Sequence, residues 1–429
     1  MLQYRDLKHS GELLQSLWGA LPSPLFARWA SIFLSFSVWT CMLSLAASQA
    51  FLALAGVCYA IHLLRDKPGI RFPPVKLPLL VFCFLTVLSV ISATRPSPGW
   101  LAVRKLVLFL ILLFATNLVV RRRHLEAILR VLFVESGVVA LVGMAQFISR
   151  YYATLASSPH RLYALMTSRE RIQGFMGHWM NFGGQQMLVS AALLVFLVLG
   201  TPRKKIWWLM LWVVIAISIV LSLTRGVWVG CFVAALYALA CWKPRWLVVI
   251  PILMVIAYFA SPYLVRERLK VTLHPASDPA LSIRFEMWHV GLNMMRTHPW
   301  LGVGPDDVER DYTLYLPVGQ APIRGYHSHL HNNFLQLGAE RGLPGLAAWI
   351  WFMGTLGWHM FRISRRVDEQ QWIARAGMAA WLAFVTEGCF EFNFGTSPVL
   401  MLFLFLAATP FILERLESCR PHSEESGFL

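Results

Sequence analysis

The chain has 429 residues, of which 57% are hydrophobic and only 14% are charged, against about 25% charged residues in an average soluble domain. Its 38 basic and 22 acidic side chains leave a formal net charge of +16. These values exclude a disordered chain, a disulfide-rich secreted module and an ordinary soluble enzyme. A basic chain this apolar is typical of a polytopic membrane protein, whose positive charge is sorted by topology, rather than of a nucleic-acid binder.

Twelve apolar runs are predicted to be membrane spans, because a span needs roughly 20 mostly apolar residues. The stretch 206–242 is interpreted as two spans, since a single helix of that length would measure roughly 55 Å. We therefore expect an all-α fold with about twelve transmembrane helices. The runs lie near residues 29–47, 49–64, 77–94, 101–120, 125–148, 182–200, 206–223, 226–242, 246–262, 343–361, 373–392 and 397–413.

The Lys and Arg residues indicate how these spans are oriented. Twenty-one of the 38 lie in the termini and in the connections on one side of the predicted bundle, whereas the short connections on the other side carry only Arg95 and Arg225. By the positive-inside rule the first side is cytoplasmic, so we expect both termini in the cytoplasm. The predicted parts are a cytoplasmic N-terminus (1–28), spans 1–9 (29–262) with an outward loop at 149–181, a long outward loop (263–342), spans 10–12 (343–413) and a cytoplasmic tail (414–429).

The long outward loop is expected to contain helices of its own, because a structureless connection of that length is uncommon. Ser282 is predicted to cap a helix that runs to about Met295. A second helix is predicted from about His329 to Gly342, where the sequence leads into the tenth span.

The same loop carries six of the thirteen histidines. His327, His329 and His331 alternate, which on an extended strand is a ligand-like spacing for a metal, although no Asp, Glu or Cys lies close by in sequence to complete the set. In a helix, His331 would instead share a face with Leu335 and Gly338. There it would be either a structural, hydrogen-bonded side chain or a general base that works near neutral pH.

Four arginines lie where the orientation of the spans does not require them. Arg225 is at an outward hairpin, Arg284 is in the first predicted loop helix, and Arg161 and Arg171 are in the other outward loop. Guanidinium groups bind phosphate oxygens bidentately. The alternative for each is a snorkelling or solvated side chain. Their type and location favour a site for an anionic ligand on the outward side.

Other ionisable residues lie inside the predicted spans or at their ends, where such groups usually pair or line a cavity. Lys105 and Glu135 are within geometric reach of one another and would then form a structural pair. Glu387 and Glu391, near the outer end of the eleventh span, are spaced to share a helix face. They would hold an arginine in place or form hydrogen bonds with sugar hydroxyls.

The late part of the sequence resembles one known family. The element His331-Asn332, followed nine residues later by Gly342-Leu343-Pro344-Gly345, resembles the signature of the bacterial O-antigen ligases. These form a wider superfamily with O-antigen polymerases and O-oligosaccharyltransferases. Further motifs similar to that family are Arg171-Ile172-Gln173-Gly174 with Asn181, Leu223-Thr224-Arg225-Gly226, and Arg284 with Trp288 and the stretch from His298 to Pro305.

The resemblance implies a multi-span fold like that of type C glycosyltransferases and a metal-independent, inverting glycosyltransferase that needs no cofactor. It would transfer O-antigen polysaccharide from undecaprenyl pyrophosphate to a sugar hydroxyl of lipid A–core. The reaction would take place at the periplasmic face of the inner membrane of a Gram-negative bacterium, with the active site in the periplasmic loop 263–342. Its partners would be these two lipid-linked substrates and the membrane lipids, and not a nucleic acid.

The same resemblance assigns roles to individual residues. His331 would be the general base that takes the proton of the acceptor hydroxyl. Either Asn332 or Glu340 would orient the imidazole or the acceptor. The donor pyrophosphate, whose developing charge arginines can stabilise where no metal does, would be bound by Arg225, Arg284, Arg171 and Arg161.

Two other classes of function remain open at this point. An O-antigen or capsule polymerase, or a protein O-oligosaccharyltransferase, needs the same histidine and arginines, so that only the acceptor separates it from a ligase. A transporter of an anionic, lipid-linked solute would show inverted repeats and broken midplane helices. The sequence shows neither, and its polar residues cluster outside the spans rather than at mid-depth.

Overall fold

The structure is a computed structural model of the chain. It describes residues 19–168, 170–273, 279–317, 319, 322, 328–366 and 371–418. Two of the loop histidines, His274 and His327, lie outside these ranges, as do residues 1–18 and 419–429 at the two termini. Of the three histidines in the metal-site hypothesis, only His329 and His331 lie within the described residues.

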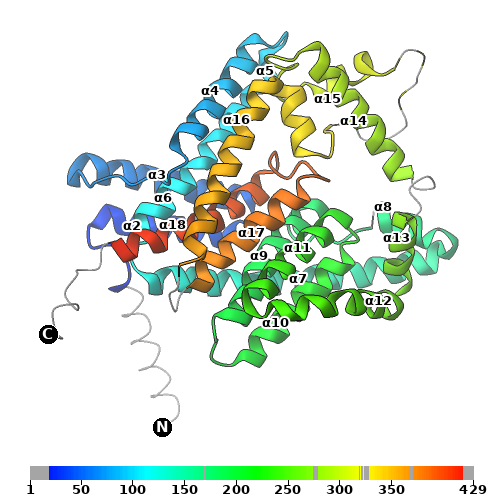
Figure 1. Cartoon of the computed structure of the whole chain (residues 1–429), viewed down its shortest axis with the longest axis horizontal. Helices are drawn as coiled ribbons and strands as arrows, with labels where there is room; N and C mark the ends of the chain where they lie inside the picture. Colours follow the sequence, from blue (N-terminus) through cyan, green and yellow to red (C-terminus); the bar gives the residue numbers. More distant parts are fainter. Residues whose placement is uncertain are drawn as a thin grey trace.

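All regular structure in the described part of the chain is helical (Figure 1). Each of the twelve predicted apolar runs overlaps at least one helix. In chain order these are α2 (Leu25–Thr40), α3 (Leu45–Asp66), α4 (Lys76–Ser92), α5 (Pro96–Lys105) with η1 (Leu106–Phe109) and α6 (Leu110–Leu118), α7 (Arg122–Ser157), α9 (Trp179–Leu199), α10 (Lys205–Leu221), α11 (Arg225–Trp242), η3 (Pro244–Val249) with α12 (Ile250–Ala260), α16 (Asn333–Ser364), α17 (Gln371–Glu387) and α18 (Ser397–Ser418).

Within the described residues, six helical segments are long and apolar enough to cross a membrane, namely α3, the segment from α5 to α6, α7, α9, α11 and α18. A seventh is obtained if the α12 region and the following α13 (Tyr263–Leu273), bent by 120°, form one span. Two more apolar helices, α4 and α10, are shorter. The chain is therefore a polytopic helical membrane protein, while the number of twelve spans stays a prediction.

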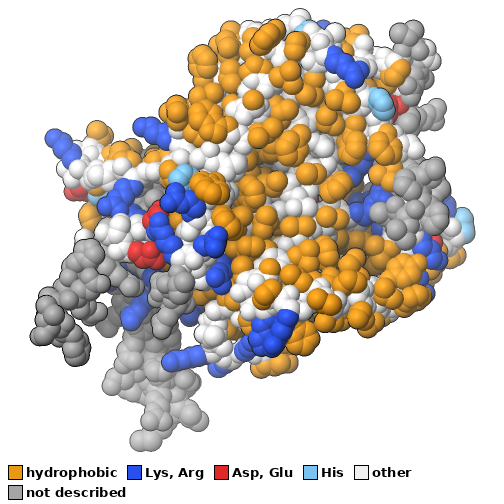
Figure 2. Space-filling view, viewed as in Figure 1, with side chains coloured by type: hydrophobic (Ala, Val, Ile, Leu, Met, Phe, Trp, Pro, Cys, Tyr) orange, Lys and Arg blue, Asp and Glu red, His pale blue; other side chains and the backbone are white. Residues whose placement is uncertain are grey.

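The central helices of the bundle are α9, α17 and α18. Both α9 and α18 have most of their residues buried, which requires apolar side chains on all faces of the helix. The neighbours of α17 are α9, α11, α16 and α18, and α16 also packs along α4. Most of the surface seen in Figure 2 is hydrophobic, and its Lys and Arg side chains gather mainly at the left and bottom of the view, towards the side where α18 ends in Figure 1.

The outward loop forms a small helical layer with its own core. The first predicted loop helix is α14 (Pro279–Thr297), so Ser282 lies in its first turn rather than at its cap. It is followed by α15 (Val308–Asp311) and η5 (Tyr312–Tyr315). Met287, Met294 and Tyr312 are among the buried residues of the core between them. The other short elements, in the loop 149–181, are η2 (Pro159–Arg161) and α8 (Leu162–Ser168).

The second predicted loop helix and the tenth span are one broken helix, α16. The predicted start at His329 was four residues early, because the helix begins at Asn333. The predicted end at Gly342 is a break, since Gly342 has φ +69° and lies inside α16. The break follows from Pro344, which has no N–H to give to the carbonyl four residues before it.

The carbonyls freed by this break bind the turn that follows α14. The N–H of Leu343 donates to the carbonyl of Pro299 (2.7 Å) instead of continuing the helix. The carbonyls of Ala339 and Glu340 accept instead from the N–H groups of Val303 (2.9 Å) and Gly304 (3.0 Å). These bonds explain why a glycine-rich turn and a Gly-x-Pro-Gly element occur together in the sequence. They fix the loop layer on the first part of α16.

Candidate active site

A histidine and a carboxylate from distant parts of the chain meet beside the loop layer. His331 lies two residues before α16, and Glu391 lies in the loop between α17 and α18. The Nδ1 atom of His331 is 2.9 Å from both Oε1 and Oε2 of Glu391. An ionised carboxylate has no proton to donate, so this bond requires the proton on Nδ1 and leaves Nε2 as the basic nitrogen. A histidine held in this tautomer can accept a proton from a substrate hydroxyl.

The backbone around His331 is fixed by two asparagines. Asn332 is the N-cap of α16, and its Oδ1 accepts from the N–H groups of Phe334 (2.8 Å) and Leu335 (3.1 Å), as is favoured at this position. Its Nδ2 donates to the carbonyl of Cys389 (2.9 Å). The buried Asn333 donates through its side chain to Oδ1 of Asn393 (2.7 Å). The start of α16 is thereby joined to the loop that carries Glu391.

Several basic side chains, most of them arginines, surround this pair. Nη2 of Arg284 lies 3.6 Å from Oε2 of Glu391, and Nδ1 of His329 lies 3.6 Å from Oε1. Burial, followed by the charges of Arg268, Arg284 and Arg225, lowers the pKa of Arg171 to about 9. These arginines therefore lie close enough to repel one another. A site with several cations around one carboxylate has a surplus of positive charge and suits an anionic ligand.

The pKa shifts of the other groups agree with this arrangement. Burial alone would raise the pKa of the Glu391 carboxyl, but the charge and hydrogen bond of His331, with the charges of His329 and Arg284, hold it well below its usual range. Burial lowers the pKa of His329 to about 4, against the opposing effect of Glu391. Burial also lowers the pKa of His178, which precedes α9. At neutral pH, Glu391 is thus ionised and His329 is neutral.

Three of the four predicted arginines belong to this cluster, from three separate segments. Arg284 is in α14, and Arg171 is stacked over the ring of Trp179 at 4.9 Å and bound to the carbonyl of Thr167. Arg225 is the first residue of α11, whose next residue, Gly226, packs so closely on the Glu391 loop that an added Cβ would lie 3.3 Å from Cβ of Phe390. By contrast, Arg161 is exposed at the end of η2 and has no contact with the cluster among the described residues.

The two predicted orienting residues do not touch the imidazole of His331 in the described structure. Asn332 acts on the backbone, as the cap just described. Glu340 is buried (2% exposed) and pairs with Arg341. Its Oε1 also accepts from Nε2 of Gln336 (2.7 Å), whose own Oε1 accepts from the N–H of Leu330 (2.7 Å). Glu340 is therefore linked to the backbone before His331 through Gln336.

Two expectations drawn from helical spacing were wrong. His331 does not share a helix face with Leu335 and Gly338, because it precedes the N-cap and has φ +48°. Glu391 does not share a helix face with Glu387, because α17 ends at Glu387.

The pair of Lys105 and Glu135, which the sequence allowed as a structural contact, does not form. Lys105 donates to the carbonyl of Gly395 (3.0 Å), and neither carboxylate oxygen of Glu135 has a hydrogen-bond partner in the described structure. The alternative that Glu391 holds an arginine agrees with its contact to Arg284.

His329, His331 and Glu391 are also the described residues that could hold a metal ion, since one ligand atom of each lies within 4.8 Å of the others. However, Nδ1 of His331 is at hydrogen-bond distance from Glu391, where it donates a proton rather than a lone pair. The nearby arginines would also repel a cation. We therefore interpret the cluster as a hydrogen-bonded pair inside an anion site.

Several members of the site were not assigned from the sequence. Glu391 was noticed only through its spacing from Glu387, and His329 only as a metal-ligand candidate. Arg268, which is buried in α13, and His178 were not singled out at all. His178 had a usable signal, because it lies between Gly174 and Asn181 of a motif already quoted. Arg268 had none beyond its position in the outward loop.

The fold and the site together define a polytopic helical membrane protein with a histidine–carboxylate pair inside a cluster of arginines. Residues 210–350 match the family model described as O-Antigen ligase, the family that the motifs of the sequence resemble. The matched region contains Arg225, Arg284 and His331, while Arg171 and Glu391 lie outside it. No curated protein matches the chain. The match is to a region of a family of enzymes, and it indicates an activity of the O-antigen ligase type in general.

Proposed function

We propose that the protein is a metal-independent, inverting glycosyltransferase that ligates O-antigen polysaccharide, carried on undecaprenyl pyrophosphate, to a sugar hydroxyl of lipid A–core. The reaction takes place at the periplasmic face of the bacterial inner membrane. The observation that carries the proposal is the contact between His331 and Glu391 inside the arginine cluster. It supplies a base for the acceptor and cations for the leaving group in one place.

The acceptor hydroxyl lies at Nε2 of His331 and attacks the anomeric carbon of the donor sugar from the face opposite the pyrophosphate. A new glycosidic C–O bond forms as the bond between the anomeric carbon and the phosphate oxygen breaks. The hydroxyl proton passes to Nε2 of His331, and Glu391 stabilises the imidazolium through Nδ1. Undecaprenyl pyrophosphate leaves with the bonding electron pair, and its negative charge is stabilised by Arg171, Arg225 and Arg284.

The test uses the full-length protein in lipid nanodiscs with lipid A–core and the lipid-linked glycan. The expected product is lipopolysaccharide of higher mass. In His331→Ala, turnover should fall by about 10²–10⁴-fold, the usual contribution of a general base, while the protein still inserts and purifies normally. A matched control is His289→Ala, because His289 is exposed on α14 and, among the described residues, hydrogen-bonds only to the carbonyl of Phe285.

Two outcomes would contradict the proposal. Attachment at the wild-type rate in His331→Ala would remove the base assignment. Activity that disappears in EDTA and returns with Zn²⁺ or Mg²⁺ would restore the metal interpretation of His329, His331 and Glu391. A product formed by joining donor glycans without lipid A–core would instead identify a polymerase.

A further inference from the structure

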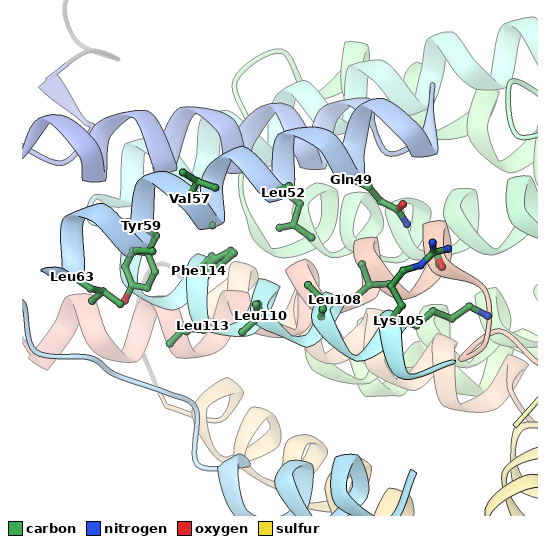
Figure 3. Close-up of a pocket in the computed structure, with 16 residues that line it drawn as sticks. Gln49, Leu52, Val57, Tyr59, Leu63, Lys105, Leu108, Leu110, Leu113 and Phe114 are labelled. Carbon is green, nitrogen blue, oxygen red and sulfur yellow. The ribbon is translucent and has the colours of Figure 1, made fainter. Parts of the chain in front are cut away.

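A long apolar groove runs along α3 and the segment from η1 to α6, away from the candidate active site. It has a volume of about 650 Å³. Figure 3 shows α3 on one side and the η1–α6 segment on the other, with Tyr59 and Leu63 near one end and Gln49 and Lys105 near the other. Apart from that second end, the lining is almost entirely hydrocarbon.

The dimensions of the groove suit a single extended hydrocarbon chain. Its lining residues on α3 run from Gln49 to Leu63, which is roughly 21 Å at about 1.5 Å per residue of helix. One leaflet contributes about half of the roughly 30 Å hydrocarbon core of a bilayer. The groove is longer than this, so an extended acyl chain of one leaflet can lie along it. Val57 and Leu110 of the lining are exposed, so the groove is open along its side to the surrounding membrane.

The second end of the groove is cationic. Arg104 is exposed there and has no hydrogen bond or ion pair with any described residue, while Lys105 donates only to the carbonyl of Gly395 (3.0 Å). Cations next to apolar surface at a membrane boundary are costly unless an anion is present. An apolar groove that ends in two cations is complementary to a lipid whose acyl chain adjoins a phosphate group.

The cationic end of the groove contacts the same loop that carries Glu391. Lys105 binds the carbonyl of Gly395, four residues after Glu391 in that loop. Between them, Asn393 is buried and bound to Asn333. A lipid in the groove is therefore held next to the loop that positions Glu391.

We propose that this groove binds the acceptor, with an acyl chain of its lipid A part along α3 and a lipid A phosphate at Arg104 and Lys105. The proposal rests on the function proposed above. In the donor, the isoprenoid is attached directly to the pyrophosphate. Because Arg171, Arg225 and Arg284 bind the pyrophosphate, the isoprenoid must start next to these arginines. In the acceptor, the phosphates and acyl chains are separated from the reacting sugar by the core oligosaccharide, which can extend around the loop to His331.

The first experiment measures binding and needs no turnover. A photocrosslinking amino acid is placed at position 53, which lines the groove, or at position 54, which is lipid-exposed on the same helix but does not line it. Each full-length protein is irradiated in nanodiscs that contain lipid A–core, undecaprenyl pyrophosphate or phospholipid alone. Mass spectrometry should show lipid A–core attached at position 53 and not enriched at position 54. Crosslinking to undecaprenyl pyrophosphate instead, or equally to phospholipid in the presence of lipid A–core, would overturn the proposal.

The second experiment measures steady-state kinetics in the ligation assay. Arg104→Gln should raise the KM for lipid A–core by about 10-fold, the size of one lost charge-assisted contact, and leave the KM for the donor unchanged. Arg95→Gln removes an equivalent exposed charge outside the groove and should leave both constants unchanged. Ala53→Trp should raise the same KM by filling the groove, whereas Leu54→Trp should not.

The two proposals fail in different ways. If the groove variants leave the KM for lipid A–core unchanged while His331→Ala is inactive, the groove assignment is wrong and the ligase function stands. If Arg104→Gln raises the KM for the donor instead, the groove holds the isoprenoid chain. If the wild-type protein gives no ligation product, the function is wrong, and the crosslinking result still decides which lipid the groove binds.

Discussion

Glu340 and Glu391 are both buried carboxylates near the start of α16, yet their surroundings differ. Glu340 pairs with Arg341, the next residue, and accepts from Asp306 N–H (3.1 Å) and Gln336 Nε2 (2.7 Å). Glu391 faces His331, His329 and Arg284, with further arginines close by. The first carboxylate is matched by one cation and by backbone and amide donors. The second is outnumbered by cations.

This difference separates a structural carboxylate from one in a binding site. A buried ion pair with all its hydrogen bonds made inside the protein has nothing left to offer a ligand. A cluster with surplus positive charge remains incompletely neutralised until an anion binds. Substitutions at Glu340 should therefore change folding, and substitutions around Glu391 should change turnover.

The largest expected effect is that of Glu391→Gln on turnover. A glutamine can present its NH₂ group to Nδ1 of His331 and so favour the tautomer that carries the proton on Nε2, which cannot act as a base. Turnover should fall on the order of 10³–10⁴-fold, as when other catalytic histidines lose their carboxylate. The ligation assay measures the change, and Glu309→Gln, at an exposed acid of α15, is the control. Wild-type turnover in Glu391→Gln would show that Glu391, like Glu340, has a structural role and no role in catalysis.

The next effect is that of Arg284→Ala, which removes one cation from the surplus. Turnover should fall by about 10²–10³-fold, the usual effect of losing one donor to a developing negative charge. Arg284→Lys should recover only part of this, since an ammonium cannot bind phosphate bidentately. Arg161→Ala, outside the cluster, should have wild-type kinetics. Equal losses in Arg161→Ala and Arg284→Ala would show that the cluster is not the pyrophosphate site.

At the other carboxylate, Glu340→Ala should reduce stability rather than chemistry. It leaves Arg341 buried without its partner, a change that costs about 3–5 kcal/mol. The expected result is a lower thermal unfolding midpoint in detergent, with turnover per folded molecule retained. The double variant Glu340→Leu with Arg341→Met should recover most of the lost stability. A stable but inactive Glu340→Ala would make Glu340 part of the active site and remove the contrast with Glu391.

The smallest effect concerns the pH dependence of stability at His329. Its pKa is about 4 in the folded protein, against 6.5 as the ordinary value. Between these values the unfolded chain binds a proton that the folded chain does not, so stability decreases as pH falls from 6.5 to 4. At pH 4 the decrease in His329→Asn should be smaller than that of the wild type by about 3 kcal/mol, because each unit of pKa shift corresponds to about 1.4 kcal/mol. Unfolding midpoints measured at several pH values test this, and identical slopes for the two proteins would show that His329 is not buried in its neutral form.

Much of the fold could be predicted from the sequence because helices in membranes depend on local composition. Each of the twelve apolar runs overlaps a helix, and Pro344 with Gly342 marks the break in α16. The errors in the predicted helices were at their ends, where the position of the capping residue determines the first helical residue. Asn332 starts α16 after His331, so the helical spacing that placed His331 beside Leu335 did not apply.

Only some residues of the candidate site could be predicted from the sequence. The motifs that resemble the O-antigen ligases contained His331, Arg171, Arg225 and Arg284, because those residues lie in short, recognisable segments. Glu391, 60 residues beyond His331, has no such context. Arg161 had the same residue type and a similar location to Arg171, yet only the latter lies in the cluster.

The sequence by itself determined that the chain is a helical membrane protein with motifs like those of the O-antigen ligases, and it identified the histidine and most of the arginines. Composition and short motifs are sufficient for this, since they act through local hydrophobicity and residue type. Only the tertiary structure decided which carboxylate contacts His331 and which arginines gather around it. It also brought α3 and α6 together into a groove that ends at Lys105. These features depend on contacts between residues far apart in the chain, and a local sequence pattern contains no information about such contacts.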